Sequence, residues 1–185
     1  MKKYILLLFT AFLLLSSDVF ALRSKKDYFL KPQVGLWFGP ITPIYTTHED
    51  VDTNLGGGLY FRYNTPFRYL KFGIDGSYQH FESDNDNRLY LIPIYGNFVF
   101  LLPLNLPVRF QFKAGAGATY VHMKPDDVRQ VDPTFMLGWE FSFPAGRVVN
   151  IGLRIDYLQI YEKHIDGANK NGHIINSGIT LYFNI

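Results

Sequence analysis

Cysteine is absent from all 185 residues of the sequence. Disulfide bonds, thiolate catalysis and zinc–thiolate sites are therefore excluded, and backbone hydrogen bonds and packing must hold the chain together. An excess of charge of one sign is also lacking, because 18 Lys and Arg residues stand against 16 Asp and Glu residues, a formal net charge of +2. This balance gives no electrostatic basis for nucleic-acid binding, and we expect no nucleic-acid partner.

Long hydrophobic runs are missing except at the start of the chain. Two lysines precede the mostly apolar residues 4–15, and the small-residue pattern of a cleavage site follows at 19–21. A membrane-spanning helix needs about 20 apolar residues, whereas the polar residues 16–18 interrupt this run. The pattern predicts a cleaved signal peptide at residues 1–21, with a single domain at residues 22–185.

Helical periodicity is also lacking after residue 21, whereas alternation with period two recurs along the chain. From Leu70 to Gln79, one face carries Leu, Phe, Ile, Gly and Tyr, and the other carries Lys, Gly, Asp, Ser and Gln. Such alternation is typical of β-strands with one apolar and one polar face. The pattern predicts eight strands, at residues 33–41, 55–63, 70–79, 88–102, 108–120, 134–143, 149–157 and 174–185.

The fourth predicted strand departs from clean alternation. Leu89, Leu91, Val99 and Leu101 place apolar groups on its second face, and Pro93 lies within it. Because proline has no N–H to donate to a neighbouring strand, we expect a bulge or an irregular stretch near Pro93.

The predicted connections between strands alternate in length. The longer, polar ones are residues 45–54, 82–87, 124–132 and 163–171, and the short ones, with proline or glycine, are 64–68, 103–107 and 144–147. Bacterial outer-membrane barrels show this asymmetry, with long loops outside and tight turns and both termini in the periplasm. The sequence therefore predicts an all-β protein, an eight-stranded antiparallel up-and-down transmembrane β-barrel in the outer membrane of a Gram-negative-type bacterium, reached by export through the periplasm.

A soluble β-barrel or sandwich would show the same alternation, with the apolar face turned inward. Three features favour the membrane: large aromatic-rich apolar faces, glycines among the charges of the polar faces, and aromatic residues near strand ends, as at the two lipid interfaces. The residues predicted for these two aromatic girdles are Tyr63, Tyr69, Tyr78, Phe81, Tyr120, Phe143, Tyr157, Tyr161 and Tyr182.

The polar faces would then line a lumen just wide enough for side chains to fill. An isolated ion there carries a desolvation cost of several kcal/mol, so we expect pairing between strands, with Lys113 and Glu140 in one network. The predicted lumen charge network comprises Arg62, Lys71, Asp75, Arg109, Lys113, Glu140, Arg154 and Asp156. This hypothesis favours a structural or surface-interaction barrel with a plugged polar lumen, and the alternative is a narrow channel for ions or small solutes.

The last predicted strand ends in a recognisable pattern. Asn176, Gly178, Leu181 and Phe183 resemble the C-terminal β-signal of outer-membrane proteins: a polar residue, a glycine two positions later, and two hydrophobic residues spaced by two. The usual terminal aromatic is displaced inward, since two residues follow Phe183. The resemblance implies that the outer-membrane assembly machinery is a partner during biogenesis.

Across the predicted mature domain, the architecture resembles the small outer-membrane barrels of the group that includes the OmpA transmembrane domain, OmpX and OmpW. The resemblance implies integration among outer-membrane lipid and lipopolysaccharide, with long loops outside that are available to an extracellular ligand. We expect no cofactor. Roles in this group range over adhesion, surface protection and small-molecule passage, and fold alone does not choose among them.

One segment bears on catalysis. His164-Ile165-Asp166 is similar to the His-x-Ser segment of the PagL lipid A deacylases, with Asp166 in the place of the nucleophile, and Ser177 lies on the following strand. Because a hydrolase needs a nucleophile, a base and an acid together, we expect no enzymatic activity. A lipid A deacylase remains the minority alternative.

Acidic residues gather in the predicted loops. Their carboxylates could hold Ca²⁺, but no complete twelve-residue calcium loop is present. We therefore expect solvated loops and no metal site. These residues are Glu49, Asp50, Asp52, Asp84, Asp86, Asp126 and Asp127.

Overall fold

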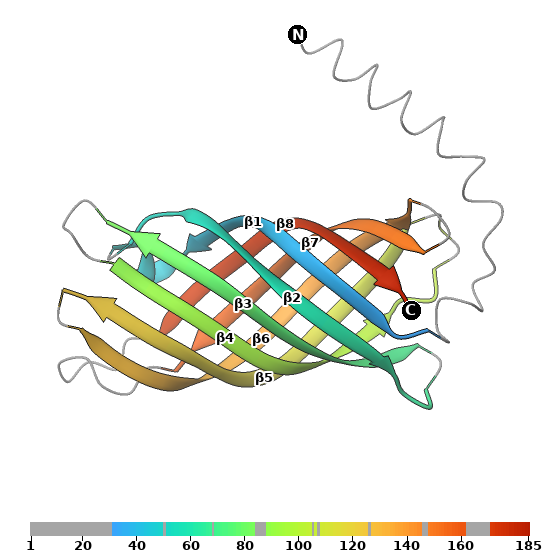
Figure 1. The fold of residues 1–185 in the computed structure, drawn as a ribbon, viewed down its shortest axis with the longest axis horizontal. Coiled ribbons are helices and arrows are strands. Elements are labelled where there is room, and N and C mark those ends of the chain that lie inside the picture. Colours follow the sequence, from blue (N-terminus) through green and yellow to red (C-terminus); the bar gives the residue numbers. More distant parts are fainter. Residues whose placement is uncertain are drawn as a thin grey trace, which may run out of the picture.

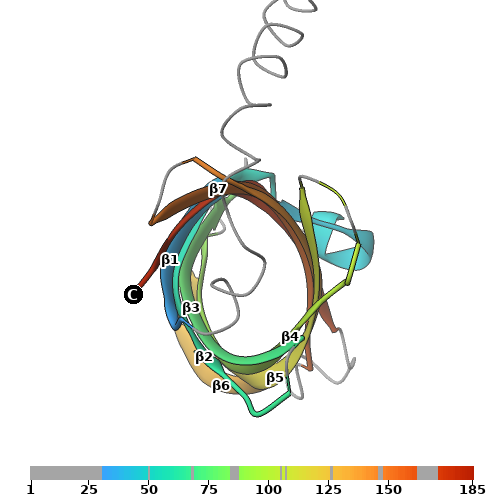
Figure 2. The same ribbon diagram turned by 90° about the vertical axis from the view of Figure 1, so that its right-hand side faces the viewer.

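The computed structural model describes residues 31–49, 51–67, 69–83, 88–104, 106, 108–125, 127–145, 148–161 and 171–185. Its eight antiparallel strands pair in chain order and close into a barrel (Figures 1 and 2), which confirms the predicted fold class. The strands are β1 (Gln33–Pro43), β2 (Asn54–Asn64), β3 (Leu70–Glu82), β4 (Arg88–Leu101), β5 (Arg109–Lys124), β6 (Val128–Pro144), β7 (Val149–Ile160) and β8 (Gly172–Asn184). A short 3₁₀ helix, η1 (Tyr45–Glu49), follows β1.

The predicted signal peptide, residues 1–21, lies outside the described residues. Within the described part of the chain, no helix is both long and apolar enough to cross a membrane.

The barrel has two unlike ends. One, on the left in Figure 1, carries the connections 44–53, 83–87, 125–127 and 161–171, and we call it the loop end. The other carries the connections 65–69, 102–108 and 145–148 together with the C-terminus, and we call it the turn end.

The predicted asymmetry of loop lengths is only partly present. Residues 124–132 do not form a long loop, because β5 runs to Lys124 and β6 begins at Val128, leaving a connection of three residues. The register between these strands continues from Thr119↔Asp132 to Met123↔Val128. Inward and outward side chains continue to alternate through this segment, so the two strands stay paired. The polar composition of the segment led to its prediction as a loop.

Pro93 lies within β4 without a bulge. The register with β5 is unbroken through Pro93↔Thr119, and the register with β3 is the same at Gly76↔Ile94 and Gln79↔Leu91. Of the two predicted alternatives, the bulge is therefore wrong and the irregular stretch is present. It is a two-residue gap in the pairing with β3 at Pro93, as expected where a residue lacks an N–H donor.

The barrel interior has an apolar layer near the loop end. The inward parity of β4 places Leu91 there, with 1% of its surface exposed, which explains the apolar inner face at the beginning of this strand. Packing of these side chains removes apolar surface from water at the mouth of the barrel. We define the apolar layer as Ile41, Val51, Phe81, Leu91, Val121, Met136, Leu158, Ile160 and Ile174.

Two residues predicted for the aromatic girdles point inward. Phe81 and Tyr182 have 0% of their surface exposed, so their assignment to the girdles is wrong. Both lie near strand ends, but the parity of their strands places them on the inner face, with Gln79 and Thr180. Nearness to a strand end is therefore a weaker guide than parity along the strand.

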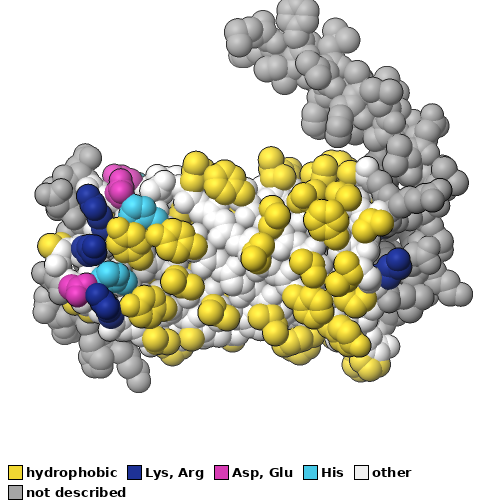
Figure 3. All heavy atoms as spheres, in the orientation of Figure 1, with side chains coloured by type: hydrophobic (Ala, Val, Ile, Leu, Met, Phe, Trp, Pro, Cys, Tyr) yellow, Lys and Arg dark blue, Asp and Glu magenta, His cyan; other side chains and the backbone are white. Residues whose placement is uncertain are grey.

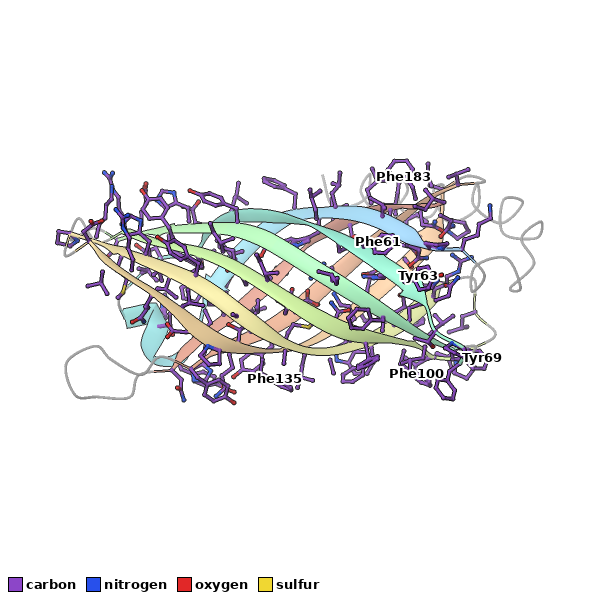
Figure 4. The ribbon with its side chains drawn as sticks, turned by 60° about the horizontal axis from the view of Figure 1, so that its bottom comes forward. Phe61, Tyr63, Tyr69, Phe100, Phe135 and Phe183 are labelled. Atoms are coloured by element: carbon purple, nitrogen blue, oxygen red, sulfur yellow. The ribbon has the colours of Figure 1, made fainter. Side chains whose placement is uncertain are left out.

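The outer face of the barrel is apolar. Large side chains such as Leu59 (67%) and Ile94 (58%) are exposed, and hydrophobic side chains are spread over the face shown in Figure 3. Figure 4 shows aromatic side chains gathered around the turn end, among them Phe61, Tyr63 and Phe183. A soluble barrel would turn its apolar face inward, so the observed orientation is the opposite of that alternative.

The barrel closes where β1 meets β8. Pairing runs through Phe38↔Ile179 and resumes at Ile41↔Asn176, with a gap opposite Pro40. At this gap the two backbones approach so closely that a methyl group on Gly39 would collide with backbone atoms of β8. Only glycine leaves room for this contact.

We predict that Gly39→Ala destabilises the barrel by about 1–3 kcal/mol, the usual cost of overpacking. The added methyl would meet backbone atoms of Ser177 and Gly178. Gly76→Ala is the matched control, since its methyl would find only Ile94 Cγ1, at 3.9 Å. Urea unfolding of both variants refolded in detergent measures the difference, and equal midpoints would contradict the close approach at the closing seam.

Candidate functional site

The candidate site is the filled lumen, to which the inward parity of β2, β3, β5, β6 and β7 brings charged side chains. Six of them, with at most 2% of their surface exposed, form a central cluster. Three are cationic and three are anionic, so the cluster is balanced at neutral pH. Its members are Arg62, Asp75, Lys113, Glu140, Arg154 and Asp156.

One half of the cluster joins β2 to β6 across the lumen. Arg62 binds Glu140 through both terminal guanidinium nitrogens, with Nη2–Oε2 at 2.5 Å and Nη1–Oε1 at 3.2 Å. Gln111 Nε2 donates to Glu140 Oε1 at 3.3 Å. The guanidinium also lies 4.3 Å from the ring centroid of Tyr60. A bidentate pair with a further donor satisfies most of the hydrogen-bonding capacity of the carboxylate.

The other half joins β7 to β3. Arg154 Nη2 donates to Asp75 Oδ2 at 2.7 Å, and Arg154 Nε donates to Asp156. Lys113 Nζ lies 2.6 Å from Asp156 Oδ1, and Asn97 donates to Asp75 Oδ1 at 2.7 Å. Each carboxylate therefore meets a cation and at least one other donor, as burial of a charge requires.

Aromatic rings connect the two halves. The Arg154 guanidinium lies 5.3 Å from the Trp37 ring and 5.6 Å from the Tyr60 ring, and Tyr60 also contacts Arg62. The Tyr60 hydroxyl lies 2.6 Å from Thr180 Oγ1. Ring faces attract cations at this range, so the aromatic groups contribute to holding both guanidinium groups in place.

Lys113 and Glu140 do not form an ion pair with each other, because each pairs with a different residue. Both are fully buried on neighbouring strands, but Lys113 meets Asp156 and Glu140 meets Arg62. In the register, Lys113 lies opposite Gly138 and Glu140 lies opposite Gln111. Sequence analysis could place both on the inner face, but it could not show pairs formed across the lumen between strands that are not neighbours.

The two remaining predicted lumen cations lie nearer the turn end. Lys71 donates to the Lys31 carbonyl oxygen at 2.9 Å and to Asn64, and Arg109 donates to Asn150 Oδ1 at 3.0 Å. These hydrogen bonds go to neutral acceptors, whereas the cations of the central cluster bind carboxylates.

Sequence analysis missed the aromatic partners of the cluster. Tyr60, Tyr95 and Tyr182 are buried on the inner face, where Tyr95 accepts a hydrogen bond from Arg154 and Tyr182 bonds Ser142. The signal was present, since Tyr60 has the same parity as Arg62.

The residues of the predicted assembly pattern lie on β8. Asn176 is buried in the lumen, with 1% of its surface exposed, whereas Phe183 points outward, with 38% exposed. Leu181 has the outward parity of Phe183, and Gly178 lies beside the β1 backbone.

The catalytic alternative falls largely outside the described residues, since His164 and Asp166 lie in the segment 162–170. Ser177 is described, and it lies on β8 opposite Ile155.

Most of the acidic loop residues also lie outside the described residues: Asp50, Asp84, Asp86, Asp126 and the side chain of Glu49. Asp52 is exposed. Asp127 accepts hydrogen bonds from His122 and Arg129, which hold the pKa of its carboxyl below the usual range. Within the described ranges, no group of three or more His, Asp or Glu side chains is placed to hold a metal ion.

Comparison with known proteins finds similarity in fold alone. No family model and no curated protein matches the sequence. Among solved structures, the barrel is similar to Neisserial surface protein A (TM-score 0.63, 11% identity, 83% of this chain and 97% of that chain). It is also similar to the N-terminal barrel domain of Pseudomonas aeruginosa OprF (TM-score 0.55, 10% identity, 84% of this chain and 98% of that chain). A third similar structure is the outer-membrane enzyme PagL (TM-score 0.50, 11% identity, 83% of this chain and 99% of that chain).

These similarities confirm the predicted resemblance at the level of fold. The chain has the fold of the small eight-stranded outer-membrane barrels. Because these structures include both a surface protein and an enzyme, the shared fold leaves the specific role open.

We predict that Arg62→Ala and Glu140→Ala each destabilise the barrel by about 3–5 kcal/mol, because each leaves an uncompensated charge in the lumen. The double variant should lose much less than the sum of the two. Denaturant unfolding in detergent measures this coupling. The same cycle with Lys113→Met and Glu140→Ala should give a smaller coupling, and an equal or larger one would contradict the observed pairing.

Proposed function

We propose that the protein is an integral outer-membrane barrel with a closed lumen, serving as a structural or surface-interaction barrel. The observation that carries this proposal is the lumen, where a balanced charge cluster lies beneath an apolar layer. The apolar outer face supports residence in lipid, since exposed apolar surface of this extent is costly in water.

The charge cluster argues against a conducting pathway. Arg62–Glu140 joins β2 to β6 and Arg154–Asp75 joins β3 to β7, so two ion pairs cross the interior. A permeating ion would have to separate such pairs, at a cost of about 3–5 kcal/mol each. The apolar layer adds a second barrier, because ions and water are poorly solvated among aliphatic side chains.

The proposed orientation follows the usual one for such barrels, with the loop end outside the cell and the turn end in the periplasm. In the strand order, the connections that follow β1 and β7 flank the β1–β8 seam at this end. His173 N donates to Thr47 Oγ1 at 3.0 Å and ties η1 to β8 there. An extracellular ligand would be contacted at this end.

We predict that the purified barrel gives no sustained single-channel current in planar bilayers. Arg62→Ala/Glu140→Ala combined with Leu91→Ser and Met136→Ser removes one of the two crossing ion pairs and weakens the apolar layer, so it should produce measurable conductance. Steady ohmic current through the unmodified protein would favour the channel instead.

The minority enzymatic alternative has its own readout. Mass spectrometry of lipid A from cells with and without the protein should show the same acylation pattern, and loss of an acyl chain would overturn the non-enzymatic assignment.

We further propose the outer-membrane assembly machinery as a partner during biogenesis, acting on Asn176, Gly178, Leu181 and Phe183. Since β8 is the last strand and pairs with both β7 and β1, its delivery completes the barrel. Phe183 is exposed on the outer face, where a recognition factor could reach it before closure.

We predict that Phe183→Ala strongly lowers the outer-membrane yield in cells while refolding in detergent stays nearly normal, with a stability loss of at most about 2–3 kcal/mol. Phe61→Ala is the matched control, because Phe61 is also an outward phenylalanine near the turn end, 41% exposed against 38% for Phe183. Heat-modifiable mobility in gels measures both yields. Equal cellular yields for the two variants would remove the recognition role of Phe183.

A further inference from the structure

One side of the outer wall carries charge and histidine at the loop end. In Figure 3, Lys, Arg, Asp, Glu and His side chains gather at this end, next to the hydrophobic face. They come from the outward positions of four neighbouring strands and from the β5–β6 turn. We call this surface the β3–β6 wall and define it as His80, Glu82, Arg88, Tyr90, His122, Lys124, Asp127 and Arg129.

The first row of the wall is set by the strand register. His80 lies opposite Tyr90, Tyr90 opposite His122, and His122 opposite Arg129. The rings stack, with centroids 4.5 Å apart for His80 and Tyr90 and 5.6 Å apart for Tyr90 and His122. Three neighbouring strands therefore contribute to a continuous row of stacked rings that ends in a guanidinium group.

A second, charged row lies one step closer to the loop end. Glu82 lies opposite Arg88, and Arg88 opposite Lys124. Lys124 Nζ reaches back to 5.9 Å from the Tyr90 ring, and Asp127 pairs with Arg129 at 3.2 Å. The described wall holds three fixed cations against two carboxylates, an excess of one positive charge before any histidine is protonated.

On its other side, the first row borders the apolar face. Tyr78, Ile92, Tyr120 and Val131 form the next row, and all four are exposed, at 54%, 38%, 37% and 65%. From Tyr78 to Glu82 the strand advances about 13 Å. Over this distance the wall changes from apolar through aromatic to charged, the order in which a lipid presents its acyl chains, its backbone and its headgroup.

The opposite side of the barrel differs. At the loop end of β7 and β8, Tyr157 and His173 stack at 6.0 Å, and Tyr45 packs edge-on against His173 at 5.3 Å. This group carries aromatic rings without a neighbouring Lys or Arg among the described residues. Among the residues that the structure describes, the cationic surface at the loop end therefore lies on one side, as expected of a binding site and not of a general interfacial girdle.

We infer that the β3–β6 wall binds the phosphate groups of lipids in the surrounding leaflet, an inference that rests on the proposed membrane residence. The guanidinium groups of Arg88 and Arg129 can each bind two phosphate oxygens, and Lys124 adds a point charge. Acyl chains would lie on the apolar row, while the stacked rings, which lie between the apolar and charged rows, contact the sugar or glycerol backbone. A soluble anion would make no use of the apolar row, so a phosphorylated lipid fits this wall better than free phosphate.

The test measures lipid binding by native mass spectrometry of the full barrel in detergent, with bisphosphorylated lipid A, its monophosphorylated form and phosphatidylcholine as probes. We expect bisphosphorylated lipid A to bind best. R88Q/K124Q/R129Q should weaken its binding by about tenfold or more, because each cation beside an anionic headgroup contributes severalfold. Binding of phosphatidylcholine should change little.

The matched control reverses the sign of the change. Glu82→Gln/Asp127→Asn keeps the size of both side chains and removes two negative charges from the same wall, so it should tighten binding of lipid A severalfold. K31Q removes a cation near the turn end and should leave binding unchanged. A merely structural role of the wall would weaken binding in both multiple variants.

Several outcomes would overturn the inference. They are equal binding by R88Q/K124Q/R129Q and the unmodified barrel, an equal loss with K31Q, or competition by millimolar inorganic phosphate as effective as that by lipid A. Failure of the proposed function looks different, since the unmodified barrel would then fail to insert into vesicles at all. Insertion is therefore measured first, by flotation of each variant with the vesicles.

Discussion

A charge buried inside an eight-stranded barrel must meet an opposite charge, and the interior of this protein depends on that constraint. The central cations and carboxylates are fully enclosed by the barrel wall. Because desolvation of one lone ion costs more than most single contacts supply, the cluster is stable only when complete. Arg62–Glu140 and Arg154–Asp75 satisfy this requirement across the lumen, and in doing so they join opposite walls.

The same requirement explains why small residues stand among the charges. Gly138 lies beside Asp156, and a methyl group there would collide with the carboxylate that Lys113 and Arg154 share. The backbone on the inner face must therefore recede where two cations converge on one acid. Alternation of glycine with charged residues in the sequence is thus a packing requirement of a narrow lumen, and it is what a strand buried on its polar side should look like.

The sequence predicted the eight strands and their parity, since period two survives in nearly every strand. It placed all the central charges on the inner face for the same reason. It did not predict their pairing, because alternation reports the face of a residue and says nothing of the strand across the lumen.

Its errors have related causes. Phe81 and Tyr182 were assigned by nearness to a strand end, although their parity turns them inward. The β5–β6 hairpin was shortened because polar residues at an exposed strand end resemble a loop. Both errors arise where another signal, position along the strand or polarity, was preferred to periodicity.

Stability and recognition fall on opposite faces of one sheet. Each strand devotes one parity to the lumen, where substitution is limited by charge balance and volume, and the other to the surroundings, where only the general character of the side chain is required. The outer wall can therefore acquire a specific surface, such as the stacked row of His80, Tyr90 and His122, without disturbing the cluster inside. Such a separation lets one closed ladder tolerate very different sequences, as expected where solved barrels share this fold at 11% sequence identity.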